Sequence, residues 1–87
     1  MIGTNDFRAQ AVQVFENLRA ALAAAGADFP RVVRLNYYVL DMANLPTLRE
    51  IRSGYLKSEP PASTLVEVRK LAHEQFMLEI EAIAVAE

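Results

Sequence analysis

The C-terminal end of the chain shows the strictest alternation of apolar and polar positions. Over residues 77–85, one set of alternate positions is apolar and the other is partly acidic: Leu78, Ile80, Ala82 and Ala84 against Glu79, Glu81, Ile83 and Val85. A period of two is typical of a half-buried β-strand. Acids on a strand are costly to bury without partners. We therefore predict a strand here and expect its acidic face to meet water, another subunit or a ligand.

Two further segments, 31–40 and 62–68, are also predicted strands, because they alternate and the first is rich in Val and Tyr. In the first, one face holds Val33, Leu35, Tyr37 and Val39, and the other holds Arg34, Asn36 and Tyr38. In the second, Thr64, Val66 and Val68 alternate with Ser63, Leu65 and Glu67.

Two other segments carry apolar residues at the 3–4 spacing of amphipathic helices. The first spans 5–25, with Thr4 or Asn5 as its cap, Asp6 favourable to its dipole, and Gly26 at its end. Its apolar stripe is Phe7, Ala11, Val14, Leu18, Ala21, Leu22 and Ala25, and the residues off the stripe are Gln10, Gln13, Glu16 and Arg19. The second helix spans 44–57, with Pro46 in its first turn and a narrower stripe of Leu45, Leu48, Ile51 and Tyr55.

The predicted order is helix, strand, helix, strand, strand, within a single α+β domain over 1–87. A strand–helix–strand unit from 31 to 68 predicts two parallel strands. Both helices need the same apolar sheet face. The opposite face then collects Arg34, Asn36, Tyr38, Ser63, Glu67, Glu79 and Glu81. A partly charged face of this kind is expected either to pack against a second sheet or to line a solvent-filled cleft.

Composition narrows the function classes. The 87 residues are 53% hydrophobic, which is rich for a small monomer and favours self-association. The net charge of −2 argues against nucleic acid. With no Cys and the single His73, no metal site or cofactor is expected. No apolar run is long enough to span a bilayer, so we expect a cytoplasmic protein with no membrane partner.

Four sequence segments resemble the Rid proteins, also called YjgF or reactive intermediate imine deaminases. They are NLRAALAAAG (17–26), VVRLNYYVLDM (32–42), PPASTLVEV (60–68) and LEIEAIAV (78–85). The resemblance implies a chorismate-mutase-like α+β fold, with a mixed sheet and two helices on one face. It also implies a homotrimer with small-molecule clefts between subunits. The implied activity is hydrolysis of 2-imino acids to 2-keto acids and ammonia, and some members carry an older label, ribonuclease.

The resemblance also implies site residues. Glu79 matches the glutamate that holds the attacking water. The position of the arginine that binds the substrate carboxylate is Ser63, and a neutral hydroxyl cannot replace a bidentate charged pair. Ser63, Thr64 and Tyr38 are candidate ligand contacts, although a polar strand start explains the first two equally well. Arg34 either neutralises the nearby acids or serves as a substitute carboxylate anchor.

Family members also begin with additional strands, whereas this sequence starts just before the first helix, so the resemblance implies an N-terminally truncated fold with an uncovered sheet edge. The explanations left open are a truncated coding sequence, a wrongly assigned start and a rearranged assembly. Two hypotheses follow. The first is a hydrolytic deaminase of reactive imines or enamines, with altered or lost activity on 2-imino acids. The alternative is a non-catalytic small-molecule-binding or assembly module on the same scaffold. A ribonuclease or translation inhibitor is least favoured, because the predicted cleft is acidic.

Overall fold

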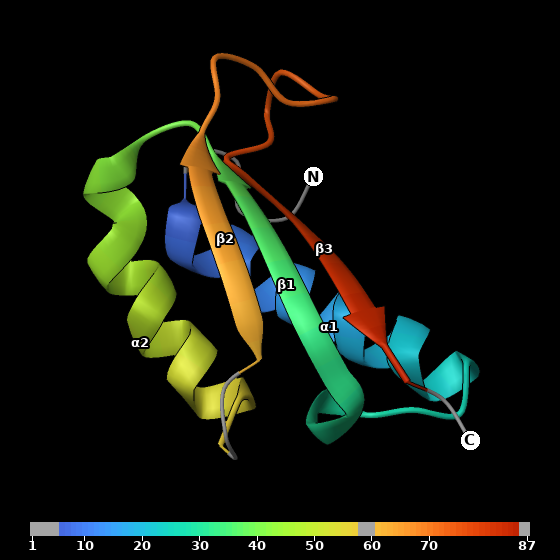
Figure 1. Cartoon of the computed structure of the whole chain (residues 1–87). Helices are drawn as coiled ribbons and strands as arrows, with labels where there is room; N and C mark the ends of the chain where they lie inside the picture. Colours follow the sequence, from blue (N-terminus) through green and yellow to red (C-terminus); the bar gives the residue numbers. More distant parts are fainter. Residues whose placement is uncertain (1–5, 58–60, 86–87) are drawn as a thin grey trace.

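The computed structural model describes residues 6–57 and 61–85. Two α-helices pack on one face of a mixed three-stranded sheet, as the sequence predicted (Figure 1). The elements are α1 (Phe7–Ala24), β1 (Val32–Val39), α2 (Leu45–Tyr55), β2 (Ala62–Glu67) and β3 (Leu78–Ala84). Short 3-10 turns, Phe29–Arg31 and Met42–Asn44, precede β1 and α2.

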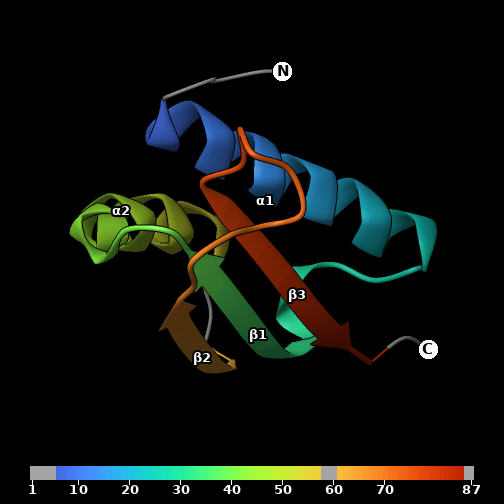
Figure 2. The same ribbon diagram turned by 90° about the horizontal axis from the view of Figure 1, so that it is seen from above.

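The strand order is β2-β1-β3, so β1 is the central strand. It pairs in parallel with β2, as predicted for a strand–helix–strand unit, and antiparallel with β3. Both helices lie on the same side of the sheet, and the opposite side, here called the open face, is uncovered (Figure 2).

The ends of α1 are set by local hydrogen bonds. Asp6 is the N-cap, and its side chain accepts a hydrogen bond from the backbone N–H of Ala9. The predicted caps Thr4 and Asn5 lie outside the described residues. At the other end, Gly26 has φ +77° and the N–H of Ala27 donates to the carbonyl of Leu22 at 2.8 Å. This is a Schellman arrangement, which a glycine adopts without steric cost.

The buried face of α1 differs from the predicted stripe. Phe15 is fully buried and Gln10 is 3% exposed, whereas the predicted stripe residues Ala21 and Ala25 are exposed. The reason is aromatic packing, because the Phe15 ring stacks on Tyr55 of α2 with centroids 4.9 Å apart. The helix is turned so that this large ring, rather than the smaller alanines, enters the core.

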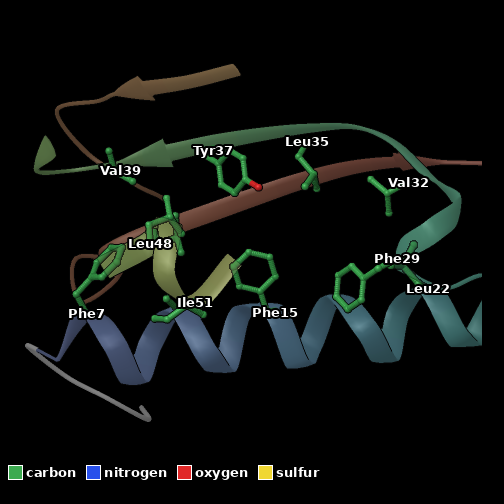
Figure 3. Packing of buried hydrophobic residues seen from close by; sticks show 12 residues of the cluster. Phe7, Phe15, Leu22, Phe29, Val32, Leu35, Tyr37, Val39, Leu48 and Ile51 are labelled. Atoms are coloured by element: carbon green, nitrogen blue, oxygen red, sulfur yellow. The ribbon is translucent and has the colours of Figure 1, made fainter. Parts of the chain in front are cut away.

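The core lies between the sheet and the two helices (Figure 3). β1 supplies Leu35, Tyr37 and Val39 to it, as predicted. The prediction for Val33 is wrong, since it is 50% exposed while Val32 is buried. A register shift between β1 and β3 falls between Val32 and Arg34, and this irregularity turns Val33 outward.

The predicted faces of β2 are inverted. Ser63 is the partner of Leu35 and Glu67 is the partner of Val39, so both lie on the helix side of the sheet and not on the open face. Glu67 Oε1 instead accepts the N–H of Met42 at 3.0 Å. Because β2 is at one side of the described sheet and most of its residues are exposed, its apolar pattern does not distinguish the two faces.

Candidate functional site

The candidate site lies on the open face, where β1 and β3 meet the loop that follows β2. Cross-strand pairing sets Tyr38 of β1 opposite Glu79, and Asn36 opposite Glu81. Residues 68–77, here called the 68–77 loop, form the orange segment at the top of Figure 1. A cavity of about 330 Å³ lies between this loop and the sheet, and its lining is Tyr38, Val68, Lys70, Leu71, Ala72, Glu79 and Glu81.

Glu79 is the half-buried carboxylate at the floor of this cavity. Its Oε1 accepts a hydrogen bond from the backbone N–H of Ala72 at 2.9 Å. This bond joins β3 to the 68–77 loop and fixes the orientation of the carboxylate. It occupies one oxygen, and the second oxygen has no hydrogen bond to a described residue, so it can accept one from a water or a ligand.

Gln10 holds the 68–77 loop in place from the core side. Its Nε2 donates to the carbonyl of Gln75 at 2.8 Å, and its Oε1 accepts the N–H of Met77 at 2.8 Å. A buried amide that meets both a donor and an acceptor satisfies two backbone groups at once. Gln10 therefore positions the segment that supplies the hydrogen bond to Glu79, and sequence reasoning missed it because it lies off the predicted apolar stripe.

Glu81 has a different partner from Glu79. The Tyr38 hydroxyl donates to Glu81 Oε1 at 2.5 Å. This hydrogen bond raises the pKa of Tyr38, because the phenolate would lose the bond and stand beside a carboxylate. The two acids of β3 therefore have separate roles: Glu81 is engaged by a side chain, and Glu79 is held by the backbone alone.

Arg34 and Thr64 share the open face but bind each other. Arg34 Nη2 donates to Thr64 Oγ1 at 2.5 Å, across the β1–β2 pair. Within residues 6–57 and 61–85, Arg34 forms no ion pair with Glu79 or Glu81. Both interpretations of Arg34, as the residue that neutralises the nearby acids and as a substitute carboxylate anchor, stay predictions.

Ser63 is not brought together with the other candidates. It lies on the helix side of β2, in a separate pocket of about 260 Å³ that it shares with Tyr37, Arg52, Leu56 and Pro61. Glu79 lies on the open face of β3, on the far side of β1. Within one protomer, a single small ligand therefore cannot contact both residues.

Residues 6–57 and 61–85 contain neither a cluster of metal ligands nor a helix that could span a membrane. No three His, Asp or Glu side chains there are grouped so that they could hold a metal ion. Neither described helix has the length and apolar character that a membrane span requires.

Comparison with known proteins identifies the family. The family model described as Endoribonuclease L-PSP matches residues 1–86. The chain therefore belongs to this family, the Rid or YjgF proteins. The family resemblance read from the four sequence segments is thus confirmed.

Individual relatives agree with this assignment. Protein DfrA of Myxococcus xanthus is 41% identical over 81 residues, which are 93% of this chain and 61% of DfrA. A 2-iminobutanoate/2-iminopropanoate deaminase of Mus musculus is 38% identical over 76 residues, 87% of this chain and 56% of the deaminase. The crystal structure of the Rid-family protein YyfB from Yersinia pestis superposes with a TM-score of 0.88 at 38% identity, covering 97% of this chain and 65% of YyfB. The chain thus spans less than two thirds of the length of each.

Proposed function

We propose that the cavity on the open face binds a reactive imine or enamine and that Glu79 directs a water onto it. The observation that supports this role is the fixed orientation of Glu79. Its Oε1 is held by the Ala72 N–H, and its carboxylate lines the cavity. The name of the 38% identical mouse relative, an iminobutanoate/iminopropanoate deaminase, supports the reaction class.

The proposed reaction is a hydrolysis. A water held by Glu79 attacks the carbon of the C=N bond while Glu79 accepts a proton from that water. A C–O bond forms as the C=N π bond breaks, and its electrons go to nitrogen, which takes up a proton. The resulting carbinolamine loses ammonia to give the carbonyl product. Glu81 remains bound to Tyr38 in this scheme, so it shapes the cavity but does not receive the proton.

We further propose that activity on simple 2-imino acids is altered or lost. Ser63 occupies the position at which the resemblance places a carboxylate-binding arginine, and a hydroxyl offers no charge-assisted bond. The same substitution favours the second candidate function, a module on the Rid scaffold that binds a small molecule without turnover.

The proposed assembly is a homotrimer with clefts between subunits. Two features support contact between copies. The open face has no covering layer in the described chain, and it exposes Ile83 by 57% and Val66 by 40%. In addition, Ser63 and Glu79 lie on opposite faces, so a ligand that touches both must bridge two protomers.

The test measures ammonia release from freshly generated 2-iminopropanoate and from neutral imines. Glu79→Gln keeps an acceptor for the Ala72 N–H but cannot accept a proton. We expect it to reduce the rate about 100-fold or more, with an unchanged mass by light scattering. Glu74→Gln, an exposed residue of the 68–77 loop that does not line the cavity, is the matched control.

The outcomes separate the candidates. A large loss of rate in Glu79→Gln alone supports the deaminase. Equal rates in wild type and Glu79→Gln would contradict the role of Glu79. An assembled wild-type protein without activity on any imine would favour the binding module. Robust turnover of 2-iminopropanoate by the wild type would show that the reasoning from Ser63 is wrong.

A further inference from the structure

Glu79 lines a second cavity besides the one on the open face. α1 runs beside β3 (Figure 2), and a cavity of about 490 Å³, here called the α1–β3 groove, lies between them. Its lining is Gln10, Gln13, Val14, Asn17, Phe76, Leu78, Glu79 and Ile80. Among the described residues, Glu79 is the one that this lining shares with the open-face cavity of about 330 Å³. A molecule bound at Glu79 can therefore extend into either space.

The two cavities lie on opposite faces of the sheet and meet at its edge. The alternation of β3 places Leu78 and Ile80 against the helix layer, whereas Glu79 belongs to the open face. β3 is the last strand of the sheet within residues 6–57 and 61–85, so no described strand separates the cavities on its outer side. A bound molecule can therefore pass around the edge of β3 at Glu79.

The wall of the α1–β3 groove is uncharged except at Glu79. Four of its side chains are apolar and three are neutral amides. The amides are already engaged, because Gln13 Nε2 donates to Asn17 Oδ1 at 2.7 Å and the two amide atoms of Gln10 bind backbone groups of the 68–77 loop. An aliphatic group gains free energy by leaving water for such a wall, whereas a buried anion would find no cation to pair with. The groove therefore suits an uncharged aliphatic group.

We propose that the Glu79 site acts on N-alkyl imines, in which the nitrogen carries an uncharged aliphatic substituent that occupies the α1–β3 groove. This inference rests on the proposed hydrolysis at Glu79 and names its substrate class. The carbon side of the C=N bond lies in the open-face cavity, and the nitrogen substituent passes around the edge of β3. An imine whose nitrogen carries only hydrogen leaves the groove to water and forgoes its apolar contacts.

The reaction consumes one water and releases a primary amine in place of ammonia. The water oxygen forms a C–O bond as the C=N π bond breaks, and the proton accepted by Glu79 passes to nitrogen. The carbinolamine then breaks its C–N bond. Its hydroxyl proton is transferred to the departing nitrogen as the C=O bond forms. Both N–H hydrogens of the released amine thus derive from the water, and the reaction needs no oxidant or reductant.

The experiment compares freshly prepared N-methyl and N-butyl imines of acetone and measures amine release, with the rate in buffer subtracted. The acetone imine of 4-aminobutanoate, which has a chain of similar length that ends in a carboxylate, tests the uncharged character of the groove. Asn17→Trp introduces a large ring at an exposed position of the groove wall. Val12→Trp is the matched control, at an exposed position of the same helix that lines neither cavity.

We expect kcat/KM to be at least about tenfold higher for the N-butyl than for the N-methyl imine, because the longer chain buries more apolar surface. The carboxylate-ended imine should react at least about tenfold less efficiently than the N-butyl imine. Asn17→Trp should lower the ratio of the N-butyl to the N-methyl kcat/KM by about fivefold or more, because the ring competes with the butyl chain for the groove. Val12→Trp should leave this ratio unchanged.

The outcomes distinguish this inference from the proposed hydrolysis itself. Hydrolysis of both imines with equal kcat/KM would overturn the inference and leave the role of Glu79 intact. An unchanged ratio in Asn17→Trp, or an equal change in Val12→Trp, would also overturn it, because the butyl chain would then lie elsewhere. A wild-type protein that hydrolyses neither the N-methyl nor the N-butyl imine, nor any N–H imine, would overturn the proposed hydrolysis and this substrate class together.

Discussion

Replacement of Tyr37 by phenylalanine tests whether the hydroxyl is truly without a partner. The substitution keeps the ring among its neighbours and removes only the oxygen, which makes no hydrogen bond of ordinary geometry within residues 6–57 and 61–85. A buried polar group without a partner costs about 1–3 kcal/mol. The nearby Arg52 charge and any water in the pocket lower this cost. We therefore expect removal of the hydroxyl to raise the free energy of unfolding by an amount near the lower end of that range. Tyr37→Phe should therefore raise the free energy of unfolding by about 1 kcal/mol in the absence of ligand.

The measurement is urea denaturation at one fixed protein concentration, because association changes apparent stability. A gain of this size also raises Tm by about 4–8 °C in a chain of this length. Tyr55→Phe is the matched control. The Tyr55 hydroxyl donates to Glu16 Oε2 at 2.6 Å, so its removal should lower the free energy of unfolding by about 0.5–1.5 kcal/mol.

Alkaline pH gives a second readout of the same hydroxyl. Burial raises the pKa of Tyr37 above its ordinary value in the unfolded chain. The unfolded state then loses its proton first, so stability falls as pH rises above about 10. Tyr37→Phe removes this contribution and should flatten the alkaline decline. A variant that is less stable than wild type at neutral pH, with an unchanged alkaline decline, would refute the reasoning.

Three further predictions follow from the site. Gln10→Leu leaves the carbonyl of Gln75 and the N–H of Met77 unpaired, so it should lower the free energy of unfolding by about 2 kcal/mol or more. If the protein is active, the same substitution should also reduce the rate, although Gln10 itself does not touch the reacting atoms in the proposed reaction. Ser63→Arg should raise kcat/KM for 2-iminopropanoate by about tenfold or more. An unchanged kcat/KM would contradict the proposal that this position binds the substrate carboxylate. Dilution below the dissociation constant of the assembly should abolish activity per chain, since the proposed cleft lies between protomers, and activity that is independent of protein concentration would contradict an intersubunit site.

The fold could be predicted largely because the patterns are strong where the chain is buried. Period-two alternation located β1 and β3 and assigned Glu79 and Glu81 to the open face. The same reasoning failed for β2, where most positions are exposed and Ser63 therefore carries no burial signal. It also failed at Val33, because a register shift is a property of strand pairing and not of local sequence.

Only part of the site could be predicted from the sequence, because some of its contacts join residues that are far apart along the chain. Glu79 and Tyr38 are conspicuous as polar residues on apolar strands. Gln10 contacts residues 65 and 67 positions away, and no local pattern encodes such a contact. The signal that could have identified it is its place one turn after Phe7, close to the core-facing stripe. No local pattern distinguishes Arg52 from the exposed Arg49 of the same helix, although the Arg52 side chain lies over the Tyr37 ring.

The difference between the two glutamates of β3 follows from what each one accepts. Glu81 accepts its hydrogen bond from the Tyr38 phenol, a donor that can itself exchange a proton. Glu79 takes its hydrogen bond from the Ala72 N–H, which has no proton to exchange in catalysis and leaves the second oxygen to the cavity. An acceptor that can gain a proton without losing its support is the better general base. β3 therefore carries, two residues apart, one carboxylate bound by a side chain and one held by the backbone, to which the proposed reaction is assigned.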